Sequence, residues 1–251
     1  MVPTYLHTIS YKFKYAKNMV RFENELFVVD HEEPAIFVFS TIDGKMQRTI
    51  GKTTNPQFSE LVNPKGIFIT DYKLFVSDKN GVHIFGSNSR EYLDKIPFDF
   101  KSANAISMSS DELFISDENC IHVFSKDYSH MYTIGEDKLE NVSSICYFED
   151  KLYVADEELC QVLIFDKKGH YITSISSFNT PKSIFVSDTR NELFVANTYN
   201  NQIVVFDART YKHLYNMDEL EYVYSLYAFD AELYLINSNK VHVFRLNERV
   251  D

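Results

Sequence analysis

Six carboxylate or amide side chains recur about every 40 residues, and they are the most regular candidates for chemistry in this chain. Each ends a phrase made of a leucine, an aromatic residue and two small or apolar residues. The six are Asp30, Asp78, Asp117, Asp156, Asn197 and Asn237. A ring of such oxygens could bind a hard cation such as Ca²⁺. Asp and Asn at strand ends also bond to nearby backbone and fix turns. Because each of the six belongs to a separate repeat, we favour turn formation.

Three histidines also recur at one position of the repeat and suggest zinc. They are His83, His122 and His242. Zinc requires three or four ligands that converge at about 2.0–2.3 Å, whereas equivalent residues of different repeats are spread through a fold. We therefore expect packing roles for them. No spacing in the chain supports a Ser, His and Asp constellation either.

The elements that carry these residues follow from the period. The leucines of the six phrases are 48, 39, 39, 41 and 40 residues apart, which is typical of a propeller or solenoid. Each repeat has four short runs rich in β-branched and aromatic residues, separated by Asp, Asn, Gly and Ser, and such runs indicate strands. We name these strands a to d in chain order; the leucine phrase is strand b, and the fifth strand d is expected at Tyr211 to Tyr215. No helix is expected.

Runs such as Leu74-Phe75-Val76 are apolar at consecutive positions, as expected when both faces of a sheet are covered. The sequence therefore predicts an all-β, six-bladed β-propeller of four-stranded antiparallel blades, in a single domain over residues 1–251. The last repeat lacks strand d, and the run Tyr5 to Ile9 resembles one. We expect this N-terminal strand to complete the last blade by pairing with Val241 to Leu246.

The residue pattern of the repeat resembles that of the NHL-repeat family. The carrying segments are Pro56-Gln57-Phe58, Asn63-Pro64-Lys65-Gly66-Ile67 and Leu74-Phe75-Val76-Ser77-Asp78, and the fifth repeat, from Thr180 through Asp207, matches best. The chain departs from the family in having only 7 glycines and in lacking the usual Asn-His-Arg before strand c. The resemblance implies a divergent six-bladed propeller. Some NHL-type propellers bind single-stranded RNA on one face.

Other six-bladed propellers are lactonases, esterases or a lyase, and they hold a metal on residues at the start of strand a, in the central channel. The corresponding positions here are Lys17, Lys65, Asn104, Ser143, Lys182 and Tyr224. These positions include no carboxylate and no histidine, so we expect neither a metal nor another cofactor there.

The same positions suggest an anion site. Lys17, Lys65 and Lys182, with Lys101 and Arg21 nearby in sequence, would surround the channel mouth on the face that carries the b-to-c and d-to-a loops, which we call the top face. We expect Lys65 and Lys182 to be exposed. They are either solvated loop residues or a site for an anion or acidic peptide.

Two further features are expected on the top face. Tyr199 is an aromatic residue of the kind that anchors interfaces, although it could equally be an ordinary loop tyrosine. The longest loop, Gly51 to Val62, would project beside Lys65, and loops that exceed the minimum length tend to be functional.

Composition limits the partners and the compartment. A net charge of −11 makes nucleic acid an unexpected partner, because binding to phosphates needs clustered Lys and Arg. No apolar run reaches the roughly 20 residues of a membrane helix, and the N-terminus shows no signal peptide. Cys120, Cys146 and Cys160 follow no metal or disulfide spacing, as in a reducing compartment. We expect a cytoplasmic protein. The abundance of Asn, Ile, Lys, Tyr and Phe also indicates an AT-rich genome, and if that genome belongs to a large DNA virus, we expect a location in the virion or the host cell.

We therefore predict a non-enzymatic, monomeric propeller scaffold that binds another protein or an acidic peptide through its top face. The predicted contact residues are Lys17, Lys65, Lys101, Lys182, Tyr199 and Tyr224. The alternatives are a metal-dependent, lactonase-like hydrolase and an RNA-binding NHL-type propeller.

Overall fold

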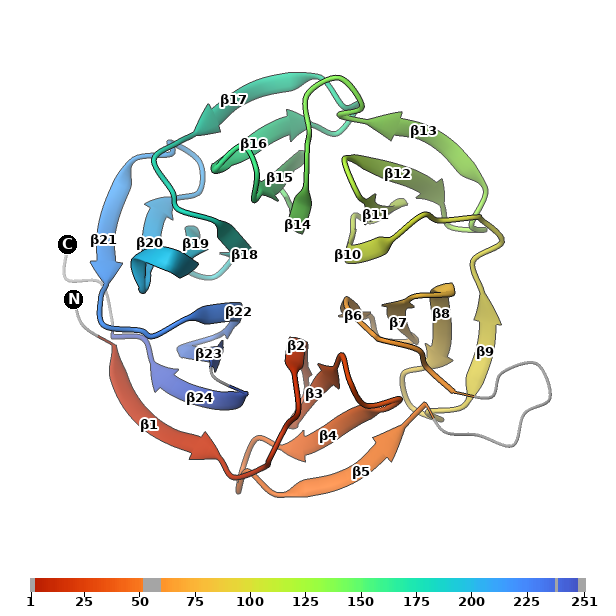
Figure 1. The fold of residues 1–251 in the computed structure, drawn as a ribbon, viewed down its shortest axis with the longest axis vertical. Helices are drawn as coiled ribbons and strands as arrows, with labels where there is room; N and C mark the ends of the chain where they lie inside the picture. Colours follow the sequence, from red (N-terminus) through yellow and green to blue (C-terminus); the bar gives the residue numbers. More distant parts are fainter. Residues whose placement is uncertain (1–2, 52–59, 238, 248–251) are drawn as a thin grey trace.

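Six four-stranded antiparallel sheets are arranged as blades around a central axis in the computed structural model, which describes residues 3–51, 60–237 and 239–247 (Figure 1). Blade 1 comprises β2 (Ala16–Phe22), β3 (Glu25–Asp30), β4 (Ile36–Ser40) and β5 (Met46–Ile50). Blade 2 comprises β6 (Ile67–Ile69), β7 (Lys73–Asp78), β8 (Gly81–Gly86) and β9 (Tyr92–Lys95). Blade 3 comprises β10 (Ala103–Met108), β11 (Glu112–Asp117), β12 (Cys120–Ser125) and β13 (His130–Ile134).

The second half of the ring repeats this order. Blade 4 comprises β14 (Val142–Phe148), β15 (Lys151–Asp156), β16 (Gln161–Asp166) and β17 (Tyr171–Ile175). Blade 5 comprises β18 (Pro181–Ser187), β19 (Glu192–Asn197), β20 (Gln202–Asp207) and β21 (His213–Met217). Blade 6 comprises β22 (Val223–Phe229), β23 (Glu232–Asn237), β24 (Lys240–Arg245) and β1 (Thr4–Ile9).

The leucine and aromatic pair of each strand b joins each blade to both of its neighbours. Successive side chains of a strand point to opposite faces, so Leu74 packs in the cluster shared with blade 1, whereas Phe75 packs in the cluster shared with blade 3. All six pairs follow this rule, and every member is at most 2% exposed. Burial of each such side chain stabilises the fold by about 1.5–3 kcal/mol. The repeated pair therefore accounts for the stacking of the blades.

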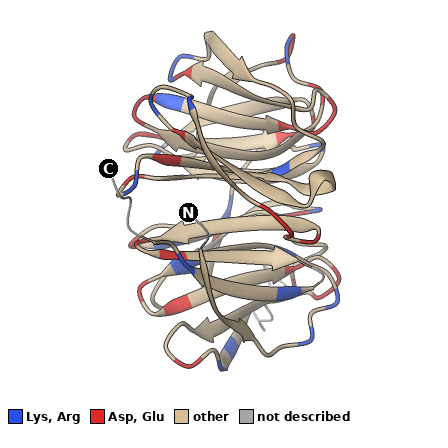
Figure 2. Cartoon of the chain, turned by 90° about the vertical axis from the view of Figure 1, so that its left-hand side faces the viewer, with Lys and Arg blue, Asp and Glu red and all other residues tan. Residues whose placement is uncertain are grey.

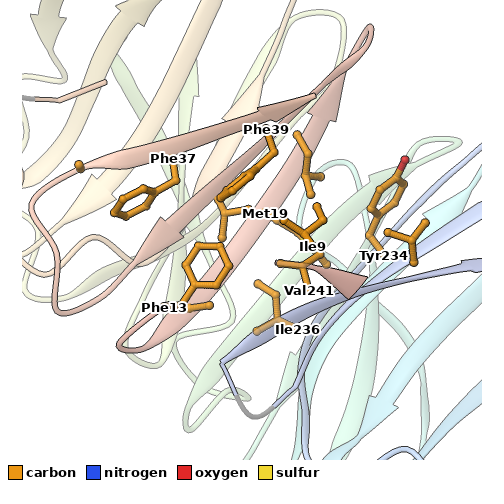
Figure 3. Packing of buried hydrophobic residues seen from close by; sticks show 13 residues of the cluster. Ile9, Phe13, Met19, Phe37, Phe39, Tyr234, Ile236 and Val241 are labelled. Atoms are coloured by element: carbon orange, nitrogen blue, oxygen red, sulfur yellow. The ribbon is translucent and has the colours of Figure 1, made fainter. Parts of the chain in front are cut away.

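The N-terminal strand closes the ring. β1 pairs with β24 from Thr4 opposite Arg245 to Ile9 opposite Val241, with a bulge between Tyr5 and His7. This confirms the predicted pairing. The buried cluster between blades 6 and 1 then includes Ile9 beside Val241 and Tyr234, together with Phe13, Met19, Phe37, Phe39 and Ile236 (Figure 3).

Serine hydroxyls connect the innermost strands of neighbouring blades. Strand a of each blade has one edge without a partner strand, so some of its backbone groups need other partners. In blades 3 to 5 a serine of strand a accepts a hydrogen bond from the next strand a. The pairs are Ser107 with Tyr147 N (2.9 Å), Ser144 with Ile184 N (3.2 Å) and Ser183 with Leu226 N (3.2 Å). The hydroxyl of Ser225 reaches Oδ1 of Asn18 at 3.1 Å and extends the series to blade 1.

Blade 5 differs from the sequence prediction in two places. Its strand d begins at His213 rather than Tyr211, because Tyr211 has a φ of 60° and its N–H closes a turn onto the carbonyl oxygen of Asp207 at 2.9 Å. Its b-to-c loop forms a short 3₁₀ helix, η1 (Thr198–Asn200), so the expectation of no helix is wrong at this turn. None of the helices among the described residues is long and apolar enough to cross a membrane.

Candidate binding site at the channel mouth

The Asp or Asn that ends strand b ties two loops together. Asp156 accepts hydrogen bonds from the backbone N–H groups of Glu140 (2.7 Å) and Asn141 (3.2 Å), in the loop before strand a, and from Glu158 (3.1 Å) in its own turn. Asp30, Asp78 and Asp117 likewise accept hydrogen bonds from backbone N–H groups of the loop before strand a. Asn197 accepts one through its Oδ1 from the backbone N–H of Asn179. The turn-forming role is therefore accompanied by a second one in blades 1 to 5, which holds the start of strand a in place.

Two of the three equivalent histidines contact these carboxylates. Nε2 of His83 lies 3.0 Å from Oδ1 of Asp78, and Nε2 of His122 lies 3.5 Å from Oδ2 of Asp117. His242 instead contacts the hydroxyl of Thr8 at 2.7 Å. The three lie in separate blades, as expected. Within the described part of the chain, no group of three or more His, Cys, Asp or Glu is arranged to hold a metal ion.

The starts of the six strands a converge on one small polar cavity at the top of the central channel, as predicted. Lys17, Lys65, Lys182 and Tyr224 line it together with Asn104 and Ser143, and the b-to-c turn of blade 4 adds Glu157. The cavity has about 20 Å³ of space for water-sized molecules, which is enough for about one water. The mouth is thus narrow and lined by ammonium, amide and hydroxyl groups.

Positive charge exceeds negative charge among these lining residues. Nζ of Lys182 lies 2.8 Å from Oε2 of Glu157, and Nζ of Lys65 donates to the hydroxyl of Ser102 at 2.7 Å. Nζ of Lys17 forms no hydrogen bond or ion pair with any residue that the structure describes, and its nearest aromatic ring is that of Tyr15, with the centroid 5.9 Å away. Among the lining residues, three ammonium groups therefore face one carboxylate, while Asp117 and Glu118 lie near Lys65 outside the lining.

Burial and mutual repulsion make this charge costly. Burial lowers the pKa of Lys17. The positive charges of Lys182 and Lys65 lower this pKa further, and the negative charge of Glu157 only partly opposes them. Burial also lowers the pKa of Lys65, against the influence of Asp117 and Glu118. A buried ammonium without a counter-charge is stabilised when an anion approaches. The geometry of the mouth therefore favours an anionic ligand.

The expectation that Lys65 and Lys182 are exposed is wrong. Lys182 lies inside β18 and its side chain is only 15% exposed, because it packs between Glu157 and the ring of Tyr224. Lys65 is half-buried. Both side chains line the mouth of the channel, Lys182 from β18 and Lys65 from the segment just before β6.

Four tyrosines form a continuous arc from the rim of blade 5 to the mouth. Tyr199 contacts Tyr222 (5.3 Å between ring centroids), Tyr222 contacts Tyr224 (5.6 Å), and Tyr224 contacts Tyr15 (5.7 Å). We call these four residues the tyrosine arc. Tyr199 and Tyr222 are 49% and 38% exposed. Nζ of Lys182 lies 5.6 Å from the ring centroid of Tyr224, so the arc and the lysines form one surface.

Tyr15, Tyr222 and Glu157 were not among the residues that the sequence predicted for this site. Tyr15 and Tyr222 directly precede strands a of blades 1 and 6, and this shared position was the available signal. His31 continues the arc beyond Tyr15 (5.8 Å between centroids). Burial lowers the pKa of His31, and the nearby charges of Lys17 and Lys65 lower it further.

Two residues proposed with the lysines do not join them. Lys101 is exposed and does not line the cavity, although its backbone N–H bonds to Asp117 at 2.9 Å. Arg21 lies near the opposite end of β2, where its guanidinium binds Glu232 (2.5 Å) and the hydroxyl of Tyr234 (2.9 Å). Of the long loop Gly51 to Val62, residues 52–59 lie outside the described residues.

Charged residues elsewhere lie in the loops of both faces and along several strands, as the side view shows (Figure 2). Acidic residues of the b-to-c turns, such as Glu118 and Glu158, accompany the mouth on the top face. The lysines therefore form a local positive site within a protein of net charge −11.

Comparisons with known proteins agree with this architecture. A family model described as a 6-bladed beta-propeller, DUF5128, matches residues 122–249. Among solved structures, the chain is similar to a crystal structure of the computationally designed Ika8 protein, with a TM-score of 0.62 and 13% identity over 92% of this chain and 71% of that one. Comparison with curated proteins finds no match. Since the family model covers 128 of the 251 residues, the chain belongs to this family of six-bladed beta-propellers.

Proposed function

We propose that this protein is a non-enzymatic, NHL-like binding module whose top face takes an acidic segment of another protein. The observation that supports this most directly is the excess of ammonium groups at the channel mouth. Lys17 has no hydrogen-bond or ion-pair partner among the described residues, while Glu157 forms its ion pair with Lys182. A carboxylate placed at the mouth would give Lys17 the charge-assisted hydrogen bond that it lacks.

The tyrosine arc extends this site into a surface suitable for a peptide. Tyrosine supplies large contact area together with a polar hydroxyl, and aromatic residues are enriched among the residues that dominate binding energy. Tyr199 and Tyr222 are exposed at the outer end of the arc, and Tyr224 lies at the mouth. An extended acidic segment could thus place a carboxylate oxygen against the lysines at the mouth and lay an apolar residue on the arc.

The resemblance to NHL repeats is consistent with a binding module. Lys65 and Lys182 both follow a proline, as in the Pro-Lys pair of that repeat. RNA is a weaker candidate, because the lysines gather at one narrow mouth, whereas a nucleic-acid strand binds along a positively charged groove that follows its phosphate backbone. A metal-dependent hydrolase would need several carboxylates or histidines that converge on the channel, where this chain has one carboxylate, Glu157, which is paired with Lys182.

The test uses a fluorescent, N-acetylated hexaglutamate peptide and a hexaglutamine peptide as its neutral control. We expect the full-length protein to bind hexaglutamate alone, more weakly as salt is raised. Lys17→Met should weaken this binding about tenfold or more, whereas Lys101→Met, which removes an exposed lysine outside the cavity, should change it by less than twofold. Tyr222→Ala should also weaken binding.

Three results would overturn the proposal. Equal losses in the two lysine variants would show that only general charge attracts the peptide. Tighter, salt-dependent binding of a ten-nucleotide oligouridine would favour the RNA-binding alternative. A rise in melting temperature of several degrees with calcium or zinc would favour the metal-dependent hydrolase.

A further inference from the structure

A cysteine, two histidines and an aspartate cluster at the b-to-c turn of blade 3. Cys120 opens β12 and is half-buried, with Sγ 3.7 Å from Nε2 of His122 and 3.3 Å from the carbonyl oxygen of Asp117. Nδ1 of the same imidazole lies 3.3 Å from Nε2 of His130, on β13. The thiol therefore lies beside an imidazole that also has a carboxylate neighbour, Asp117, at 3.5 Å.

The surroundings favour a charged His122 and a neutral His130. Burial alone would lower the pKa of His122, but Asp117 and Cys120 outweigh it and raise the pKa to about 9. Burial and the charge of His122 lower the pKa of His130. The other neighbours are uncharged. The hydroxyl of Thr133 lies 3.3 Å from Nδ1 of His122, and the rings of Phe98 and Phe100, in the segment before β10, lie 4.6 Å and 6.0 Å away between centroids. At neutral pH the thiol thus adjoins an imidazolium that is partly shielded from water.

A neighbouring cation stabilises a thiolate, and partly exposed cysteines in such surroundings are the reactive ones. We propose that Cys120 is a reactive thiol, a site of oxidation by hydroperoxides and of alkylation by soft electrophiles, with His122 as the positioning residue that stabilises its thiolate. In the oxidation the thiolate sulfur attacks a peroxide oxygen, an S–O bond forms and the O–O bond breaks. Sulfur loses two electrons to become a sulfenic acid, and the departing oxygen takes a proton from water.

Blade 4 provides a matched comparison within the same chain. Cys160 lies in the corresponding turn, and its Sγ donates to the carbonyl oxygen of Glu157, three residues earlier, at 3.4 Å, much as Cys120 does to Asp117. The residue of β16 at the level of His122 is Leu163, by its pairing with Val154 of β15. Cys160 therefore lacks the imidazolium. The third cysteine, Cys146, is partly buried in the channel wall, where loss of hydration raises its pKa to about 12.

The cluster also adjoins the mouth. Asp117 accepts the backbone N–H groups of Lys101 and Ser102, and the hydroxyl of Ser102 accepts from Lys65. An adduct on Cys120 would therefore lie near the proposed binding face, although the reactivity of the thiol does not depend on what that face binds.

The experiment measures alkylation of the native full chain by iodoacetamide, and oxidation by hydrogen peroxide, at Cys120 and Cys160 by peptide mass spectrometry between pH 6 and 9. Each tenfold gain in thiolate raises the rate only about three- to fourfold, because nucleophilicity falls as the thiolate becomes more stable. We expect Cys120 to react at least threefold faster than Cys160 at pH 6.5.

The matched variant is His122→Gln, which removes the imidazolium. It should slow Cys120 to the rate of Cys160 and leave Cys160 unchanged, whereas His83→Gln, at the equivalent position of blade 2, should affect neither. Equal rates at the two cysteines of the native parent, or an unchanged Cys120 rate in His122→Gln, would overturn the proposal. The comparison within the parent protein decides the matter even if a variant folds poorly.

Discussion

Lys182 and Glu157 form an ion pair across two blades, with Nζ of Lys182 2.8 Å from Oε2 of Glu157. Lys182 comes from β18 in blade 5, and Glu157 follows β15 in blade 4. Their side chains are only 15% and 22% exposed. Glu157 therefore acts as the internal counter-charge of the mouth, and the excess positive charge remains at Lys17 and Lys65.

Replacing Glu157 should change peptide binding and the free energy of unfolding in opposite directions. Glu157→Gln leaves Lys182 without its carboxylate, and a poorly solvated unpaired charge costs about 1–3 kcal/mol of unfolding free energy. The same change adds positive charge to the mouth, so hexaglutamate should bind more tightly. Urea unfolding and fluorescence anisotropy measure the two effects. Weaker peptide binding in this variant would show that Glu157 contributes to the ligand contact instead of screening the lysines.

Lys17→Met should have the opposite pattern, with weaker peptide binding and greater stability. Because the folded-state pKa of Lys17 is lowered from its ordinary 10.5, the unfolded chain binds the proton more tightly, and the charged lysine destabilises the fold at neutral pH. Methionine keeps the apolar stem, so the free energy of unfolding should rise by up to about 1 kcal/mol. The gap should narrow as pH rises toward 10.5. A variant less stable than the parent at pH 7 would contradict the inferred cost of this charge.

His122 should make stability depend on pH on the alkaline side. Its folded-state pKa, about 9, lies above the ordinary value of 6.5, so its contribution is complete below about pH 6.5 and is lost as pH rises through 9. Between pH 6 and 9 the parent should lose on the order of 1 kcal/mol more than His122→Gln, after allowance for solvent screening. If urea unfolding shows the same change in the free energy of unfolding between pH 6 and 9 for both proteins, His122 is not charged.

Asp117, which contacts His122, should make the free energy of unfolding depend on pH at acidic pH. Burial alone would raise the pKa of Asp117, but hydrogen bonds from His122 and from the backbone of Ser102 and Lys101 outweigh it and hold the pKa below its ordinary 3.8. The stability that Asp117 contributes is thus present above about pH 4 and is lost as pH falls further. Asp117→Ala should cost about 1–3 kcal/mol at pH 7 and show a flatter acid unfolding profile. Asp111→Ala, at an exposed carboxylate of the same blade, is the control.

Closure by β1 should be visible in single substitutions. Ile9 is 2% exposed in the cluster between blades 6 and 1, whereas Tyr5, on the same strand, is 54% exposed. Ile9→Ala should lower the free energy of unfolding by about 2–5 kcal/mol, and Tyr5→Ala should cost much less. Deleting residues 1–10 should expose the edge of β24 and promote association, which light scattering would detect. A truncated protein with unchanged melting temperature and mass would contradict this closure.

The repeated leucine and aromatic pair was sufficient to predict the six blades from the sequence. Adjacent side chains of a strand face opposite ways, so two apolar neighbours such as Leu152 and Tyr153 require cover on both faces, and stacked sheets in a ring provide it. The same period placed Lys17, Lys65, Lys182 and Tyr224 at one end of the channel, because strand a begins at the same level in every blade.

Only the tertiary structure decided which other groups meet these lysines and how deeply they are buried. Glu157, Tyr15 and Tyr222 occupy regular positions of the repeat, but the residue type at those positions changes from blade to blade, so the period alone does not show which side chains reach the mouth. Burial of Lys182 likewise depends on a carboxylate from blade 4 and a ring from blade 6. The period of the sequence constrains strands through backbone pairing, which repeats, whereas loop side chains meet across blades through contacts that occur only once.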